Sequence, residues 1–364
     1  MKITQIDAYP IVVPLVTPVV MANQIADRSQ NVLVRIRTDE GLVGWGEGVA
    51  APEVTGETQG EIVDAIDVVG EMLMGADPLR HSTLWRAMRR WTPSSTAVGA
   101  IDIALHDLAG KALGVPIAEL IGGRHRDRIP ALRLVGSGRP EQDLAVLASL
   151  QEEGFSWFKL KLALNDIETE AKTLREAVEL AGDSGVICGD ANEGWDDETA
   201  LRMLKGLEGS GVRFIEQPVS RDDPEALADL ASLSPIPLCA DESARTLEDV
   251  KVMASMGMGG VSLKLIKHGG ITGVMRGARI CGDRGLAINL AGKVAETSIA
   301  ATANLHCAAA MTANYYGCSP ANLGLVSDVV SEAPRLVDGD FIVPDGPGLG
   351  IEVDENLVKE MSEV

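Results

Sequence analysis

Aromatic residues are scarce in this chain of 364 residues. They occupy 3% of the positions, although hydrophobic residues of all kinds make up 46%, so the core must be mostly aliphatic. No apolar run reaches the length that crosses a membrane, and we expect no membrane partner. Residues 11–22 are apolar, but Pro14 and Pro18 interrupt them and only Lys2 precedes them as a basic residue. They fit an edge strand and loop better than a secretory signal.

Positive charge is also in short supply. The formal net charge is −21 at pH 7, whereas proteins that bind nucleic acids need a basic face. We therefore expect no nucleic-acid partner. The deficit does not exclude an anionic small molecule, because a few lysines gathered at one site can attract such a ligand.

Cysteines are few, odd in number and scattered, at positions 188, 239, 281, 307 and 318. Two of them lie inside strands that we expect to be buried. A disulfide framework needs paired cysteines in an oxidising compartment. The pattern therefore indicates free, buried thiols, and we expect the protein to be cytoplasmic.

A repeated pattern runs through the middle of the chain. Five short apolar segments each end on a charged residue, and these charges are 23 to 29 residues apart. That spacing accommodates one strand, one helix and two loops, so the repeat predicts a parallel sheet closed into a (β/α) barrel. The segments are 158–162, 186–192, 214–218, 237–242 and 261–265.

The charged residues that end these segments are Lys161, Asp190, Glu216, Asp241 and Lys264. In a (β/α) barrel the active site lies at the C-terminal ends of the strands, so all five should face one mouth. The alternation of side chains along a strand adds Lys159 to the face of Lys161, and Asn192 to the face of Asp190. One carboxylate at a strand end is usually a solvated or helix-capping residue, but five charges in phase are hard to explain that way.

Three carboxylates from consecutive strands are oxygen ligands that suit a hard cation such as Mg²⁺. Zinc fits less well, because no histidine or cysteine accompanies them at ligand spacing. The lysines then flank the metal on both sides. A buried lysine beside a cation has a lowered pKa and can act as a general base. The pattern predicts removal of a proton next to a carboxylate, with the metal stabilising the enediolate.

These motifs resemble the enolase superfamily, specifically its muconate lactonizing enzyme subgroup. The likeness covers nearly the whole chain and includes 41–47 and 100–111 in the first half, besides the segments at 190–195, 216–218, 241–243 and 264–270. The resemblance implies that Asp190, Glu216 and Asp241 bind Mg²⁺, with Mn²⁺ as an alternative. It makes Lys161 and Lys264 the acid/base pair, Lys159 an auxiliary cation, and Asn192 a supporting residue behind the ligands.

Residues 292–297 follow the next expected strand, at 286–290. Within them Glu296 resembles the family's acidic residue at that strand end. It can also be interpreted as a carboxylate favoured by the start of a helix. Lys293 is either a substrate contact or an exposed side chain. We expect His106, His125, His268 and His306 to be structural, because they lie away from the charged strand ends.

The resemblance implies an α/β fold, a modified (β/α)7β TIM-type barrel with an α+β capping domain. We expect the capping domain over 1–125, the barrel over 126–325 with its first strand at 129–136, and a C-terminal segment over 326–364 that returns to the capping domain. Strands at 1–13, 31–37 and 42–47 and helices over 57–121, among them 99–113, belong to the first part. A loop at about 17–30 would close over the substrate, a small carboxylate. The family also implies a homo-oligomer, either a dimer or an octamer.

Three reactions begin with the removal of a proton next to a carboxylate, and the motifs do not distinguish between them. Racemisation or epimerisation fits the presence of two lysines best. Cycloisomerisation of a muconate-like diacid needs only one lysine as the acid or base. In dehydration, a β-hydroxyl group leaves the enediolate. Dipeptide epimerases of the subgroup carry an Asp-x-Asp pair that holds the substrate ammonium, but residues 318–324 lack it. A substrate with a masked nitrogen, or with none, therefore fits better. A metal-dependent acid-binding protein and a structural oligomer component are the non-enzyme alternatives, but each predicts the loss of site residues that are present here.

Overall fold

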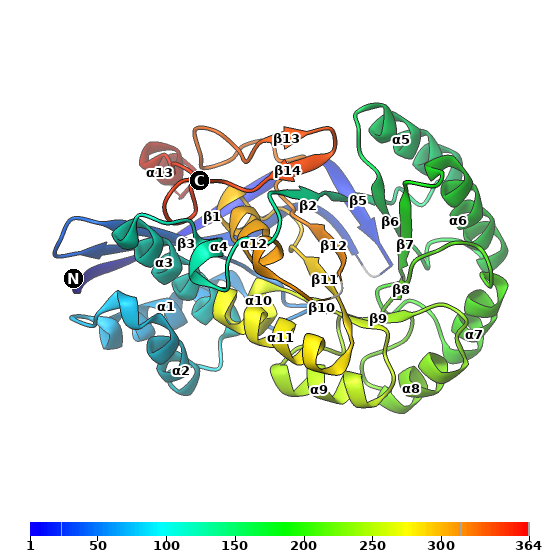
Figure 1. Ribbon diagram of the computed structural model, residues 1–364, viewed down its shortest axis with the longest axis horizontal. Coiled ribbons are helices and arrows are strands. Elements are labelled where there is room, and N and C mark those ends of the chain that lie inside the picture. The colour runs from blue at the N-terminus through cyan, green and yellow to red at the C-terminus, as the bar shows by residue number, and fades with distance from the viewer. Residues whose placement is uncertain (23, 314, 363–364) are drawn as a thin grey trace.

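The computed structural model describes residues 1–22, 24–313 and 315–362. Its largest sheet contains eight parallel strands in the order β12-β11-β10-β9-β8-β7-β6-β5, and β12 also contacts β5, so the sheet forms a nearly closed barrel (Figure 1). The expected TIM-type barrel with a capping domain is thereby confirmed. The strands are β5 (Leu132–Val135), β6 (Trp157–Lys161), β7 (Val186–Asp190), β8 (Ile215–Glu216), β9 (Leu238–Ala240), β10 (Gly260–Leu263), β11 (Ala287–Ala291) and β12 (Tyr315–Ser319).

Helices cover the outside of the barrel (Figure 1). Several begin where the sequence places a capping side chain: Asp166, Asp196 and Asp223 each accept a hydrogen bond from the backbone N–H three residues later. The helices are α5 (Pro140–Glu152), α6 (Ile167–Ala181), α7 (Asp197–Gly206), α8 (Pro224–Leu233), α9 (Leu247–Ser255), α10 (Leu265–His268), α11 (Gly270–Arg284) and α12 (Ser298–Ala310).

The capping part packs a three-stranded antiparallel sheet against helices. At the contact between β3 and α3 the backbones approach closely, because a Cβ added at Gly46 would lie 1.9 Å from the Ala100 carbonyl oxygen. Glycine is therefore required at that position. The elements are β1 (Ile3–Met21), β2 (Gln24–Thr38), β3 (Val43–Val49), α1 (Gln59–Leu73), the 3₁₀ turn η1 (Pro78–Arg80), α2 (His81–Trp91), α3 (Ser95–Leu113) and the short α4 (Ile117–Leu120).

The expectation of a loop at 17–30 is wrong in one respect: most of its described residues belong to the two paired strands β1 and β2. Val19 lies opposite Ala26 and Val20 opposite Ile25, although position 23 lies outside the described residues. Extended, β-branched side chains favour this pairing, and the prolines of β1 are tolerated because β1 is an edge strand. The hairpin still reaches the barrel, since a Cβ built on Gly194 would lie 3.0 Å from that of Ala22.

The expected first barrel strand at 129–136 is also divided. β4 (Arg128–Pro130) pairs antiparallel with β14 (Asp340–Ile342), and only β5 joins the barrel. The partner strand is about two hundred residues away, so no local pattern reveals it. The remaining C-terminal elements are β13 (Leu336–Val337) and α13 (Glu355–Ser362), and Glu355 forms a 2.7 Å ion pair with Arg35 of β2.

Two buried carboxylates connect the capping part to the barrel. Asp102 of α3 accepts hydrogen bonds from the backbone N–H (2.8 Å) and hydroxyl (2.7 Å) of Thr272 in α11. Glu47 of β3 accepts the corresponding bonds from Thr297, at 2.9 and 2.7 Å, at the start of α12. Burial raises the pKa of Asp102 to about 7. These contacts fix the capping part, which we call the roof of the barrel, relative to the barrel helices α11 and α12.

The cysteines are free, buried thiols, as expected from the sequence. Within the described ranges, none of the helices combines the length and apolar character that a membrane span requires.

Candidate active site

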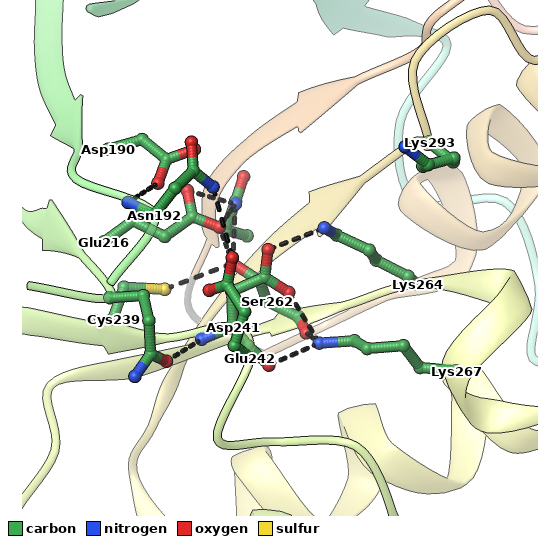
Figure 2. A network of polar contacts seen from close by, with 12 residues as sticks. Asp190, Asn192, Glu216, Cys239, Asp241, Glu242, Ser262, Lys264, Lys267 and Lys293 are labelled. Atoms are coloured by element: carbon green, nitrogen blue, oxygen red, sulfur yellow. Dashed lines mark hydrogen bonds and ion pairs between the residues drawn. The ribbon is translucent and has the colours of Figure 1, made fainter. Parts of the chain in front are cut away.

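The strand register brings the charged strand ends to one level. Lys161 of β6 lies opposite Asp190 of β7, and Asp190 lies opposite Glu216 of β8. Asp241 and Lys264 follow directly after β9 and β10. The five residues therefore gather at one mouth of the barrel, with the three acids on or directly after adjacent strands and one lysine on each flank. Figure 2 shows the three acids together with Lys264.

Lys161 is held on the β6 side of the three acids. Its Nζ donates hydrogen bonds to Asp190 Oδ2 at 2.7 Å and to Asn192 Oδ1 at 2.5 Å. The sequence placed Asn192 on the same strand face as Asp190. In the structure β7 ends at Asp190, and Asn192 lies in the following loop with a positive φ of 43°. Strand alternation therefore does not apply to it. Its amide also donates to Glu242 Oε1 at 3.2 Å, which links the loops after β7 and β9.

Asp241 lies between two ammonium groups on the other flank. Lys264 donates to its Oδ2 and Lys267 to its Oδ1, both at 2.6 Å. Lys267 is completely buried and also donates to the backbone oxygens of Asp241 and Ser262, each at 2.8 Å. Lys267 is not among the site residues that the sequence predicts. Its position in the short helix α10, which begins directly after Lys264, was the available signal.

Glu216, the central acid, has the most partners. Lys159 forms an ion pair with Oε2, Ser262 donates its hydroxyl to Oε1, and Asn289 donates its amide at 3.3 Å. Ser262 and Asn289 were missed because single uncharged polar residues inside apolar strands carry little signal. Such side chains in the interior of a barrel must find partners, and here they orient the Glu216 carboxylate.

The electrostatics of the cluster follow from burial and pairing. Burial alone would lower the pKa of Lys264, but the charges of Asp241, Glu242 and Glu216 outweigh it and raise the pKa above its ordinary value. This differs from the lowered pKa expected from the sequence, which presupposed a cation that offsets these carboxylates. Burial and the charges of Asp241 and Asp190 raise the pKa of Glu242 to about 8.

Glu296 is buried beside the cluster, and burial raises its pKa to about 8. Its Oε2 accepts a hydrogen bond from Asn304 at 3.2 Å. Glu296 directly precedes Thr297, the N-cap residue of α12, so the helix-start interpretation also stays a prediction. Its assignment as a residue near the substrate stays a prediction.

The predicted metal ligands pair with lysines rather than surrounding a common point. Among the described residues, no group of three histidine, cysteine or acidic side chains is placed to hold a metal ion as the side chains stand. The chemistry of the donors still fits a hard cation: Asp190, Glu216 and Asp241 offer only oxygen, and each already faces the positive charge of an ammonium group. The assignment of the three as ligands therefore remains a prediction.

The histidines occupy other environments. His106 donates a hydrogen bond from Nδ1 to the Asp102 carbonyl oxygen at 2.7 Å within α3, and Nδ1 of His268 lies 3.0 Å from the Lys264 carbonyl oxygen. His306 contacts Leu349 O at 3.0 Å, and His125 is exposed. Their structural role stays a prediction, although His268 lies closer to the lysine site than the sequence suggested.

Comparison with known proteins gives two family matches. Residues 5–122 match the model described as mandelate racemase / muconate lactonizing enzyme, N-terminal domain, and residues 143–357 match the enolase C-terminal domain-like model. A lysine or histidine base with Mg²⁺ is the established pattern of enolase-superfamily sites.

Individual relatives cover the whole chain. Chloromuconate cycloisomerase from Pseudomonas putida is 30% identical, with 100% of this chain and 99% of the relative aligned. N-succinyl-L-Arg/Lys racemase from Bacillus cereus is also 30% identical, over 100% and 98%. The structure of muconate lactonizing enzyme from Pseudomonas fluorescens complexed with muconolactone has a TM-score of 0.94 at 28% identity and covers 99% of each chain. The chain therefore belongs to the mandelate racemase and muconate lactonizing enzyme family of the enolase superfamily, and it is an enzyme of the isomerase class.

Proposed function

We propose that this protein is a metal-dependent racemase or epimerase that acts on the α-carbon of an N-substituted amino acid or a related carboxylic acid. The observation that carries the proposal is the placement of two lysines on opposite flanks of three acids. Lys161 is held by Asp190 and Lys264 by Asp241, with Glu216 on the strand between them. Two bases on opposite sides of one carbon can remove a proton from one face and return one to the other.

Asp190, Glu216 and Asp241 would hold the divalent ion, Mg²⁺ or alternatively Mn²⁺. When bound, that ion supplies positive charge for the negative charge that develops on the substrate carboxylate. Lys159, Ser262 and Asn289 keep the Glu216 carboxylate oriented, and Lys267 does the same for Asp241. The lysine side chains are therefore positioned before the substrate arrives.

The proton transfer itself belongs to the two flanking lysines. In one direction the neutral amine of Lys161 takes the α-proton, and the ammonium of Lys264 donates a proton to the opposite face. In the other direction the roles are exchanged. Both side chains are largely buried, with 6% and 11% of their surface exposed, so little bulk water competes for the proton.

A cycloisomerase is the second candidate. The chloromuconate cycloisomerase named above and the muconate lactonizing enzyme structure match the chain over its full length, as the racemase does. This reaction needs one lysine as acid or base, so the second lysine would serve only electrostatically.

Proton exchange in D₂O distinguishes the two candidates. The purified protein with Mg²⁺ is incubated with each enantiomer of N-acyl amino acids, and separately with muconates, and deuterium is followed by mass spectrometry. The racemase proposal requires deuterium at the α-carbon of both enantiomers. Cyclisation of a muconate without exchange of any N-acyl amino acid would favour the second candidate.

A further inference from the structure

Lys293 differs from the other lysines at the barrel mouth in the partner that it contacts. Lys159, Lys161, Lys264 and Lys267 each bond to a carboxylate of the barrel itself. Lys293, on the loop after β11, instead forms a 2.6 Å ion pair with Glu53, which belongs to the segment between β3 and α1. Lys293 is therefore an ammonium group of the barrel whose carboxylate partner, Glu53, belongs to the roof.

This ammonium group lies beside the proposed reaction site. Figure 2 shows Lys293 on the same side of the cluster as Lys264. Burial raises the pKa of Glu296, and the charges of both lysines partly offset that effect, so both ammonium groups act on this carboxyl. The Lys293 side chain is 12% exposed, whereas that of Glu53 is 38% exposed. A largely desolvated cation needs an anion nearby, but an ion pair with one solvated member contributes little to stability.

The segment between β3 and α1 also contacts the barrel loops through its backbone. Arg221 donates to the Glu53 carbonyl oxygen at 3.0 Å, and Arg245 donates to that of Thr55 at 3.4 Å. Arg221 is itself fixed by an ion pair with Glu193. The backbone is therefore tied to the barrel loops at Glu53 and Thr55 through contacts that do not involve the Glu53 carboxylate.

We propose that Lys293 is a specificity residue that binds a second carboxylate of the substrate, remote from the reacting one, and that Glu53 occupies this place until the substrate displaces it. The inference rests on the proposed function, because the reacting carboxylate is assigned to the site between Lys161 and Lys264. It narrows the substrate class to dianions. An N-acyl group that ends in a carboxylate has the required charge.

The test compares two probes that differ only in the remote charge, N-succinyl-L-alanine and its neutral counterpart N-butanoyl-L-alanine. Binding is measured by calorimetry in Mg²⁺, and α-proton exchange is measured in D₂O. The wild type should prefer the succinyl compound. Lys293→Gln should weaken its binding roughly 10- to 100-fold, the value of one charge-assisted contact, and should reduce the preference over the butanoyl compound. Glu53→Gln should strengthen succinyl binding, because it removes the competing anion.

Lys251 supplies the matched control. It is an exposed lysine of α9 that pairs with Glu248, so Lys251→Gln should change neither measurement. Equal loss of both probes in Lys293→Gln, weaker succinyl binding in Glu53→Gln, or no measurable binding of the succinyl compound would overturn the inference. Succinyl binding that depends on Lys293 without any proton exchange would support the inference and refute the proposed racemase.

Discussion

Lys267 donates to Asp241 Oδ1 at 2.6 Å from a position with no exposed side-chain surface. Removing one partner of a buried ion pair leaves an uncompensated charge. Lys267→Met should therefore lower the free energy of unfolding by about 3–5 kcal/mol, measured by urea denaturation. The same substitution at Lys251, which is exposed, should have little effect. An unchanged midpoint for Lys267→Met would show that the pair contributes nothing to stability.

The two-base proposal predicts an asymmetric result. Lys161→Ala and Lys264→Ala should each lower racemisation by about 10²–10⁴-fold, the usual contribution of a general acid or base. Each variant should still exchange the α-proton of one enantiomer through the remaining lysine. The measurement is the rate of deuterium uptake into each enantiomer. Loss of exchange for both enantiomers in only one of the variants would indicate a single base.

Metal dependence should appear in stability as well as in activity. A ligand that binds only the folded protein stabilises it by about 2.7 kcal/mol at a concentration 100 times its Kd. Chelation should abolish proton exchange, and added Mg²⁺ should restore it and raise the unfolding midpoint. Glu216→Gln should lose the stabilisation by Mg²⁺. Full exchange after exhaustive chelation would contradict the metal assignment.

His306 should make the protein sensitive to acid. Its ring lies between the Leu349 carbonyl oxygen and the Ala118 N–H, and burial lowers its pKa to about 4 from 6.5. Because the unfolded chain then takes up the proton first, stability is full above pH 6.5 and falls as the pH drops towards 4. Between pH 7 and pH 5 this histidine should contribute a loss of about 2 kcal/mol. His306→Gln should reduce that loss in urea titrations, whereas His125→Gln, at an exposed position, should not.

The contact between β3 and α3 should not accept a methyl group. Gly46→Ala would place a Cβ 1.9 Å from a backbone oxygen of α3, which cannot move alone. Overpacking of this kind costs about 1–3 kcal/mol or more, and thermal denaturation should show it. Gly60→Ala in α1 is the control, because no heavy atom lies within 4 Å of the added group. Similar midpoints for the two variants would show that the contact relaxes easily.

The sequence predicts the parts of the site that repeat with the barrel. Asp190, Glu216 and Asp241 each follow an apolar strand at a regular interval, so one periodic argument locates all of them. The same repeat also locates Lys161 and Lys264, and their catalytic roles stay predictions. The family resemblance adds the fold, which the structure confirms.

The residues that the sequence did not reveal depend on contacts across the fold. Ser262 and Asn289 matter only because their strands place them behind Glu216. The pairing of Lys293 with Glu53 depends on how the roof lies on the barrel, and the two residues are far apart in the chain. In the same way, β4 lies outside the barrel sheet because it pairs with β14. No local propensity encodes such pairings.

The register of the strands has a consequence for how activity arises. Lys161, Asp190 and Glu216 face each other only while the backbone bonds between β6, β7 and β8 are in place. A slip of one residue in any of these strands would turn its charge to the opposite face of the sheet. The proposed chemistry therefore cannot appear in a partly folded barrel. In refolding, proton exchange would return with closure of the sheet, later than the helical signal, and would mark the final cooperative step.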